Sequence, residues 1–398
     1  MSLQINLPPA SEIALANCHQ LTLAIQEAIH NAGGWIPFEQ FMNLVLYSPG
    51  LGYYNGGATK LGEAGDFVTA PEISSLFGRA IAQQVMQIAK QMHSYQILEF
   101  GAGSGKLAFD ILLALEQLDQ LPDKYLILEV SAELRERQKI WLSEQIPHLF
   151  SRIEWLHELP AQFQGVILAN EVLDAMPVHL VVWQQSQILE RGVIWDKDRF
   201  GWQDLSIQNV DLAQAAQQLL PIVTAENDWD SFAQYYVSEI NLSARYFVKS
   251  LAKMLQHGMI LLIDYGFGSR EYYHPQRHQG TLMCHYRHHA HDDPFYLPGL
   301  QDITSHVDFS AITDIANSNG LDLMGYTTQA HFLMNCGITE VLIQSATPNS
   351  VNYLAQANQL QKLVSPAEMG ELFKAIAFSK NIPESLIGFN SGDRSRLL

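Results

Sequence analysis

The sequence predicts an α/β fold in which helices cover both faces of a doubly wound, mostly parallel sheet. Four short apolar runs have the composition of buried strands: residues 95–100, 124–130, 165–170 and 259–264. Segments with helical spacing separate these runs, at about 104–119, 131–145 and 235–256. Strands that alternate with helices indicate crossover connections between parallel strands. A glycine-rich turn directly after the first run supports the same fold class.

The first 92 residues are predicted to form a helical region with one loop rich in Gly and Tyr. A helix is expected between Ser11 and the pair Gly33-Gly34, and a second one over 38–46. The loop at 48–57 contains the breakers that end the second helix. A third helix is expected from Pro71, a residue favoured in the first helical turn, to Met92. We therefore divide the chain into this N-terminal region (1–92) and a core (93–398).

Two long segments interrupt the predicted core. An insertion at about 178–234 begins with alternating apolar residues and has turn residues at 196–198, which is typical of a β-hairpin. The stretch at about 265–310 is rich in Gly, Pro, His and Tyr and has little periodicity. Loops of this length inside a folded core are usually functional.

Composition restricts the classes of partner and the compartment. Among 398 residues, 23 Lys and Arg stand against 41 Asp and Glu, a net charge of −18. This acidic balance opposes sequence-independent binding to nucleic acid and favours a basic partner. The three cysteines have no CxxC spacing, no apolar stretch is long enough to span a membrane, and no basic leader begins the sequence. We expect a cytoplasmic protein with no membrane partner; the composition does not indicate an oligomeric state.

The glycine-rich turn Glu99-Phe100-Gly101-Ala102-Gly103-Ser104-Gly105 is the strongest chemical signal in the sequence. A dinucleotide fingerprint requires G-x-G-x-x-G, but the sixth position counted from Gly101 is Lys106. A Walker A loop also fails, because the residues required before and after Gly105-Lys106 are absent. The remaining pattern, E-x-G-x-G-x-G, is motif I of class I S-adenosylmethionine (SAM) methyltransferases. In these enzymes the turn passes the amino-acid part of the cofactor.

Glu129 provides the second group that such a cofactor site requires. It ends the second predicted strand, where an acidic side chain can accept hydrogen bonds from ribose hydroxyls. The alternative is a glycine turn that only packs a helix on a sheet, with a glutamate that caps the next helix.

Polar residues at other predicted strand ends are candidates for binding the acceptor. Asn170, Glu171 and Asp174 follow the third strand, and Asp264 ends the fourth. An amide oxygen with nearby carboxylates can hold a nitrogen nucleophile and accept its proton. Glu239 is added to these candidates. The alternative is a helix N-terminus at which these side chains act as caps.

Seven histidines lie between His274 and His306, with several aspartates nearby. A metal site, a hydrogen-bonded loop and a substrate lid are three interpretations of this stretch. Because no HExxH or Cys/His ligand spacing occurs, no metal is predicted. For the polar residues of 65–75, composition favours capping of the third helix over ligand contact.

Read together, several stretches resemble the MidA-like family of bacterial and mitochondrial SAM-dependent methyltransferases, which includes a complex I assembly factor acting on arginine. They are residues 46–54, 65–72, 99–105, 170–177, 263–266 and 301–309. The resemblance implies a class I methyltransferase core with a helical N-terminal addition and an insertion. It also implies that Gly101, Gly103, Gly105 and Glu129 contact SAM, with Glu99 in the same motif.

The function expected from the resemblance is methyl transfer from SAM to arginine of a protein, with a subunit of a respiratory complex as a candidate substrate. One alternative is methylation of another protein side chain or of a small molecule. Another is a binding or assembly protein that keeps the SAM fold without catalysis.

Overall fold

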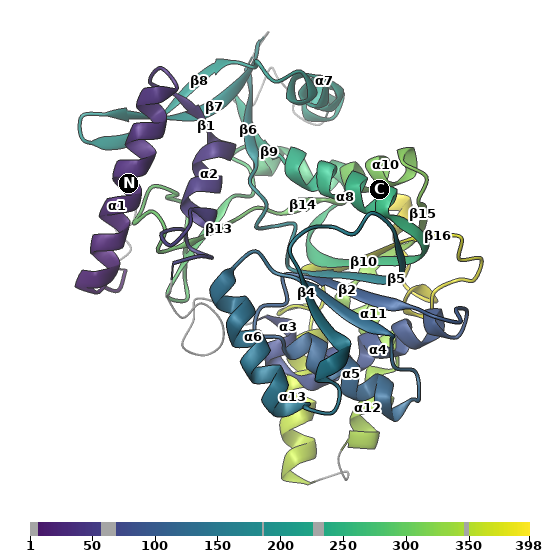
Figure 1. Ribbon diagram of the computed structural model, residues 1–398. Helices are drawn as coiled ribbons and strands as arrows, with labels where there is room; N and C mark the ends of the chain where they lie inside the picture. Colours follow the sequence, from purple (N-terminus) through teal and green to yellow (C-terminus); the bar gives the residue numbers. More distant parts are fainter. Residues whose placement is uncertain (1–6, 57–68, 185–186, 226–234, 346–349) are drawn as a thin grey trace. The chain divides into compact units, whose positions relative to one another are not determined.

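The computed structural model describes residues 7–56, 69–184, 187–225, 235–345 and 350–398 (Figure 1). The chain forms two compact units. Unit 1 comprises Met1–Phe67, Asp174–Tyr246 and Phe267–Asp308; unit 2 comprises Val68–Leu173, Phe247–Gly266 and Phe309–Leu398. These units divide the chain at other places than the predicted boundary after residue 92. No helix in the described part of the chain is long and apolar enough to cross a membrane.

Unit 2 contains seven strands of an eight-stranded mixed sheet, in the order β15-β16-β10-β5-β2-β3-β4. Neighbouring strands from β4 to β10 are parallel, and β16 is antiparallel to both of its neighbours. The strands are β2 (Gln96–Phe100), β3 (Lys124–Leu128), β4 (Ile153–Leu156), β5 (Phe163–Asn170), β10 (Leu255–Phe267), β15 (Asp322–Thr328) and β16 (Phe373–Lys380). The four strands expected from the apolar runs are confirmed as β2, β3, β5 and β10.

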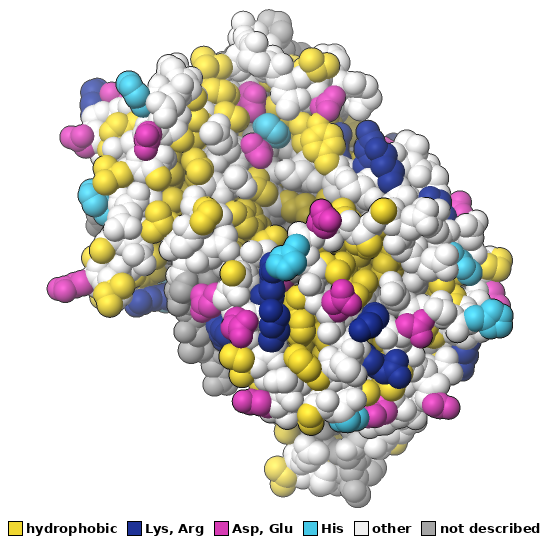
Figure 2. Space-filling view, in the orientation of Figure 1, with side chains coloured by type: hydrophobic (Ala, Val, Ile, Leu, Met, Phe, Trp, Pro, Cys, Tyr) yellow, Lys and Arg dark blue, Asp and Glu magenta, His cyan; other side chains and the backbone are white. Residues whose placement is uncertain are grey.

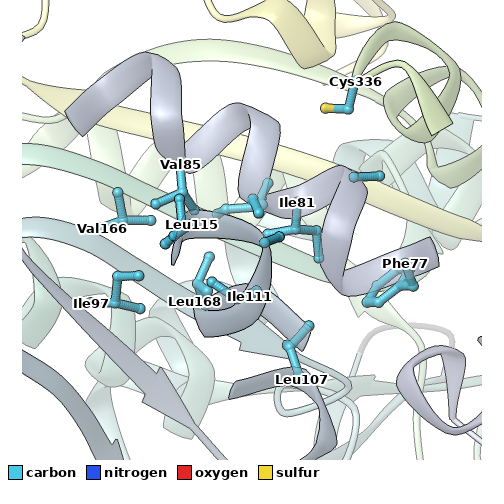
Figure 3. Close-up of a cluster of buried hydrophobic side chains, with 14 of the residues drawn as sticks. Phe77, Ile81, Val85, Ile97, Leu107, Ile111, Leu115, Val166, Leu168 and Cys336 are labelled. Atoms are coloured by element: carbon cyan, nitrogen blue, oxygen red, sulfur yellow. The ribbon is translucent and has the colours of Figure 1, made fainter. Parts of the chain in front are cut away.

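A group of helices covers one face of this sheet. Figure 3 shows side chains of α4 and α5 packed on side chains of β2 and β5, among them Ile81, Ile111, Ile97 and Val166. Gly78 lets α4 approach α5 closely, since a Cβ atom there would lie 2.6 Å from Cβ of Asp110. The helices of unit 2 are α3 (Ala70–Ile73), α4 (Ser75–Ala89), α5 (Lys106–Gln117), α6 (Ala132–Gln145), α10 (Phe309–Ser318), α11 (Gln329–Asn335), α12 (Ile338–Ser345) and α13 (Val351–Val364), with 3₁₀ turns at Phe150–Arg152, Ile387–Phe389 and Ser395–Leu397.

The other face of the sheet is also buried. Because side chains alternate along a strand, Phe100 points away from the face that Ile97 covers. Its ring packs edge-on against Phe247 of α8 (Leu242–Met254), with centroids 4.9 Å apart. On the same sheet, α10 packs through Phe309 on Tyr326 of β15. Helices on both faces confirm the doubly wound arrangement.

Unit 1 contains two antiparallel sheets and three main helices. The larger sheet has the order β1-β7-β6-β9, and β8 also pairs with β7; the smaller has the order β12-β11-β13. The strands are β1 (Ile36–Pro37), β6 (His179–Gln184), β7 (Gln187–Asp196), β8 (Arg199–Ser206), β9 (Tyr236–Ile240), β11 (Met283–Tyr286), β12 (His289–His291), β13 (Asp302–Thr304) and β14 (Val307–Asp308). The helices are α1 (Glu12–Asn31), α2 (Phe38–Tyr47), α7 (Val210–Ala225) and the short α9 (Ser269–Tyr272), with a 3₁₀ turn at Pro275–Arg277.

Three details of the expected secondary structure are wrong. The helix expected over 235–256 begins only at Leu242, because Tyr236–Ile240 pairs with β6 as strand β9. The helix expected from Pro71 breaks at Ser74, whose extended backbone (φ −158°) and side chain cap α4. The stretch 265–310 is more ordered than its composition suggests, since it supplies the three-stranded sheet. In contrast, the turn predicted at 196–198 is confirmed: Lys197 and Asp198 both have positive φ and join β7 to β8.

A buried carboxyl group lies between two central strands of unit 2. Glu99 on β2 is 3% exposed and accepts a 2.7 Å hydrogen bond from the hydroxyl of Tyr125 on β3. Burial raises the pKa of Glu99 to about 7, the nearby carboxylate of Glu129 adds to the rise, and the Tyr125 hydroxyl opposes it. An ionised Glu99 therefore destabilises the folded state at neutral pH.

The packing shown in Figure 3 generates a stability prediction. Ile81 is 1% exposed at the contact of α4 with the sheet. Ile81→Ala should lower the free energy of unfolding by about 2–5 kcal/mol, because it removes buried methyl groups and leaves a cavity. Ile140→Ala on α6, where the side chain is 52% exposed, is the matched control and should change it by less than about 0.5 kcal/mol. Urea unfolding measures both; equal effects would contradict the assigned core.

Glu99 generates a pH prediction. Its pKa is about 7 when folded and roughly 4.3 in an unfolded chain. The folded state thus binds the extra proton, and this group lowers the free energy of unfolding as pH rises from about 4 to 7. Glu99→Gln should therefore stabilise the protein at pH 8, by on the order of 3 kcal/mol, and have little effect near pH 4.5.

Urea unfolding at several pH values measures this difference between variant and wild type. Glu144→Gln, at an exposed position of α6, is the control and should leave the pH profile unchanged. A constant offset between Glu99→Gln and wild type across the whole range would contradict the prediction.

Candidate functional site

The glycine-rich turn lies at the carboxyl end of β2 in unit 2. Gly101, Gly103 and Gly105 all have positive φ, at 61°, 55° and 86°, a conformation that side chains other than glycine disfavour. Gly105 precedes the first residue of α5, so the turn leads directly to a helix N-terminus with free N–H groups. A Cβ atom at Gly101 would lie 3.2 Å from a methyl group of Val172. A side chain at Gly101 would therefore be both strained and crowded against Val172.

Glu129 stands beside this turn, at the end of the neighbouring strand β3. It is 4% exposed and accepts hydrogen bonds from the Ser131 N–H (3.0 Å) and from the Gln138 side-chain amide (3.2 Å). Burial raises the pKa of Glu129, and hydrogen bonds from Ser131, Gln138 and the backbone of Gly103 and Val130 oppose the rise. Val130 itself is 62% exposed, an apolar side chain next to the acidic one.

Gln138 on α6 hydrogen-bonds both to the glycine-rich turn and to Glu129. The sequence did not identify Gln138 as a site residue. Its amide donates to the Gly103 carbonyl (2.8 Å) as well as to Glu129, and its oxygen accepts from the Trp155 indole (2.9 Å). The side chain is completely buried. The signal in the sequence was a glutamine among charged neighbours (residues 135–139), nine residues after Glu129. Such a position has meaning only once α6 is placed on the sheet.

Glu72 is a second residue that the sequence analysis did not assign to the site. It lies in α3 and accepts a hydrogen bond from the Ser104 hydroxyl in the glycine-rich turn. Capping of the third helix was the favoured interpretation of this segment, but the contact with Ser104 joins α3 to the turn. Residues 65–68 of the same segment lie outside the described residues.

The segment after β5 carries Asn170 and Glu171. The Asn170 amide nitrogen donates to Glu171 Oε1 (3.1 Å), and Asn170 Oδ1 is buried without a hydrogen-bond partner among the described residues. Glu171 has a positive φ of 52°, and its N–H donates to the Ile263 carbonyl (2.9 Å). A strained backbone at a strand end is typical of a functional turn.

Asp264, at the same edge of the sheet, holds this segment in place. Its carboxylate accepts from the N–H groups of Val172 (3.2 Å), Leu173 (2.9 Å) and Tyr265 (2.9 Å). The side chain is completely buried. This bonding favours a positioning role for Asp264 rather than direct contact with a substrate.

The remaining two predicted acceptor residues, Asp174 and Glu239, belong to unit 1. Asp174 is 6% exposed, and its carbonyl accepts from the Ser305 N–H (3.0 Å). Glu239 accepts from the N–H groups of Thr281 (2.8 Å) and Leu282 (2.9 Å) and also from the Tyr272 hydroxyl (3.1 Å). Glu239 thus anchors the segment that leads into β11.

Unit 2 therefore gathers eight of the ten predicted site residues at the carboxyl ends of four strands. They are Glu99, Gly101, Gly103, Gly105, Glu129, Asn170, Glu171 and Asp264. In an open α/β sheet, this edge is where ligands bind. No group of three or more His, Cys, Asp or Glu that could hold a metal ion occurs in the described part of the chain.

The family comparison matches this site. The model "Putative S-adenosyl-L-methionine-dependent methyltransferase" matches residues 76–327, more than half of the chain, and includes the glycine-rich turn and Glu129. The cofactor of this family is S-adenosylmethionine, as the sequence predicts.

Solved structures give the same fold over the whole chain. A protein of Burkholderia thailandensis, crystallised with S-adenosyl-homocysteine, is 47% identical, with a TM-score of 0.92 over 99% of this chain and 100% of that one. A native crystal structure from the same organism has a TM-score of 0.90 at the same identity and coverage. The class I SAM methyltransferase fold, with additional antiparallel sheets and an N-terminal helix, is confirmed.

Curated relatives are more distant. A Drosophila melanogaster homologue of the mitochondrial protein arginine methyltransferase NDUFAF7 is 27% identical over 408 residues, covering 93% of this chain and 87% of the relative. The Danio rerio protein arginine methyltransferase NDUFAF7 is 29% identical over 376 residues, covering 86% and 83%. With the family match over its central part, the chain belongs to this family of S-adenosyl-L-methionine-dependent methyltransferases.

Proposed function

We propose that the protein transfers the methyl group of SAM to an arginine side chain of another protein. The observation that carries the proposal is the position of the glycine-rich turn, with positive φ at three glycines, beside the buried Glu129 carboxylate at the adjacent strand end. The Gln138 side chain hydrogen-bonds to both. It lies in a chain of the SAM-dependent methyltransferase family.

Each part of SAM has a matching group in unit 2. Glu129 would accept hydrogen bonds from the ribose hydroxyls, and the exposed Val130 would pack on the adenine ring. The backbone of Gly101 to Gly105 would contact the methionine part of SAM. The N-terminus of α5 would stabilise the negative charge of the methionine carboxylate. Glu72 accepts a hydrogen bond from the Ser104 hydroxyl. Its carboxylate would therefore lie near the turn, where it would bind the amino group of the methionine part of SAM.

The bound cofactor supplies a methyl group on a positively charged sulfur, and the protein has to orient the nucleophile and exclude water. Asn170 Oδ1, buried and without a partner among the described residues, would accept an N–H of the acceptor nitrogen. Glu171 would stabilise its positive charge and receive a proton. Asp264 fixes both residues through the N–H groups of the segment that follows them. Asp174 is proposed as a second acidic group for the acceptor.

Arginine as the acceptor rests on the relatives and on charge. The two NDUFAF7 relatives are named as protein arginine methyltransferases. A net charge of −18 suits a basic partner, and in Figure 2 the Lys and Arg side chains of the visible face are dispersed among Asp and Glu. We extend the proposal to a subunit of a respiratory complex as the substrate.

The proposed location is the cytoplasm. The three cysteines are free and buried, which favours this reducing compartment.

Two other functions are alternatives. One is methylation of a different protein side chain or of a small molecule. The other is an assembly protein without catalysis, which the intact glycine-rich turn and Glu129 disfavour, since a protein that no longer binds SAM has no need of either group.

Cofactor binding is tested by calorimetric titration. SAM and S-adenosyl-homocysteine should bind one-to-one, and NADH and ATP should not bind. Glu129→Gln should weaken SAM binding at least tenfold, because it removes a charged acceptor of hydroxyl hydrogen bonds. Gly101→Arg should abolish binding, because a side chain would fill the turn. Glu136→Gln on α6, where the side chain is 67% exposed, is the control. Unchanged affinity in folded Gly101→Arg protein would refute the placement of SAM.

Methyl transfer is tested with labelled SAM and cell extract, followed by mass spectrometry of the modified residues. We expect methylarginine. Glu171→Gln and Asp174→Asn should bind SAM normally and transfer methyl at least about a hundredfold more slowly, because they remove acid–base groups. Wild-type rates in both variants would show that these residues do not act on the acceptor. Methylation only of residues other than arginine would favour the alternative substrate class.

A further inference from the structure

Unit 1 carries a buried polar cluster that the cofactor site does not use. The β13 cluster, as we name it, consists of Tyr54, Asp174, Asp302, Thr304 and Ser305. Its last three residues come from the stretch 301–309, one of those that resemble the MidA-like family. For the overlapping stretch from His274 to His306, the sequence left a metal site, a hydrogen-bonded loop or a substrate lid as interpretations, and no residue of β13 was assigned to the site.

Specific hydrogen bonds bring three distant segments of unit 1 together at the cluster. The Tyr54 hydroxyl donates to Asp302 Oδ1 (2.9 Å), and the Ser305 N–H donates to the Asp174 carbonyl (3.0 Å). Tyr47 stacks on Tyr54 with ring centroids 5.3 Å apart and an interplanar angle of 25°. The Tyr47 hydroxyl in turn donates to the carbonyl of Ala175, next to Asp174 (2.9 Å).

Two carboxylates lie close to one tyrosine in this cluster. Asp174 is 6% and Asp302 is 3% exposed, so both carboxyl groups are largely removed from water. Burial raises the pKa of Tyr54 well above its ordinary value, and the charges of Asp302 and Asp174 raise it further. Across the small sheet, His285 of β11 stands opposite Asp302. The cluster thus places two buried carboxyl groups beside stacked aromatic rings.

Two hydroxyl groups of the cluster are buried and are available to accept or donate a hydrogen bond. Thr304 is 3% and Ser305 is 1% exposed, and neither side-chain oxygen has a hydrogen-bond partner among the described residues. Thr304 lies two residues after Asp302 on β13, so both side chains project from the same face of the strand. Ile303 projects from the other face, into the apolar core around α1 and α2. A buried hydroxyl without a partner costs about 1–3 kcal/mol, which a bound ligand would recover.

We propose that the β13 cluster binds the guanidinium group of an arginine of the protein substrate. Guanidinium is planar, always protonated and has five N–H donors, which carboxylate and hydroxyl oxygens can accept together. Its flat face stacks on aromatic rings, and the Tyr47–Tyr54 pair offers such rings. A lysine ammonium lacks this planar shape. The choice of arginine rests on the proposed function. Binding of a guanidinium cation to this cluster can be measured independently of SAM binding and of methyl transfer.

Binding of fluorescent peptides to the full chain tests the proposal. The probe is a pool of nine-residue peptides with randomised flanks and a central arginine; in the control pool, neutral citrulline of nearly the same shape replaces it. Fluorescence anisotropy should show that only the arginine pool binds wild type. Thr304→Val and Asp302→Asn should weaken that binding at least about tenfold. Asp292→Asn, an exposed acid of the same unit, should not alter it.

Thr304→Val keeps the shape of the side chain and removes a buried hydroxyl without a partner, so it should fold with equal or greater stability. Weaker arginine binding without loss of stability is a result that a structural role alone does not give. SAM affinity, measured on the same samples, should be unchanged.

Three results would overturn the proposal: no arginine-dependent binding to wild type, equal binding of the citrulline pool, or wild-type binding by folded Thr304→Val. If SAM does not bind wild type while the arginine pool does, the proposed enzymatic function fails and the cation site stands.

Discussion

Buried carboxylates that accept backbone N–H groups hold the loops of both units. Asp264 accepts hydrogen bonds from two N–H groups of the segment after β5, and Glu129 accepts one from the N–H of Ser131. Glu239 accepts hydrogen bonds from the N–H groups of Thr281 and Leu282. A loop in this position has no partner strand, so its N–H groups need acceptors from elsewhere. A carboxylate is a strong hydrogen-bond acceptor. Burial strengthens its hydrogen bonds, and it also raises the free-energy cost of losing one of the N–H partners. The shape of the candidate site therefore depends on these side chains as much as on the sheet.

Several groups in or near these loops do not stabilise the fold. Asn170 Oδ1, Thr304 Oγ1 and Ser305 Oγ are buried and have no partner among the described residues, and Glu171 keeps a positive φ. Each of these features costs free energy in the isolated protein. Sites selected only for stability would replace them with apolar residues or glycine. These groups lie beside the carboxylate-held loops. We infer that the protein is less stable than it could be because these groups serve ligand binding.

The sequence was sufficient for the central sheet strands and for the residues of the glycine-rich turn, because both leave a local pattern. It did not predict β4, β15 and β16, whose short or mixed composition resembles the surrounding segments. It also did not predict β9, whose residues read as the start of the following helix. Gln138 and Glu72 were not assigned for another reason. Their roles arise from contacts with Gly103 and Ser104 across separate elements, and no spacing along the chain encodes such contacts.

The division of the chain also explains why resemblance identifies the cofactor more firmly than the acceptor. All the groups proposed to bind SAM lie in unit 2, whereas Asp174 and the β13 cluster lie in unit 1, which is assembled from three separate segments. The chain passes from unit 2 to unit 1 between Leu173 and Asp174, within the very stretch that carries the acceptor candidates. With the roles proposed above, substitutions in unit 1 would change what is methylated while the cofactor groups stay the same. A shared glycine-rich turn between two relatives is consequently evidence for a common methyl donor, whereas Asn170, Glu171 and the proposed β13 cluster would bear on a common acceptor.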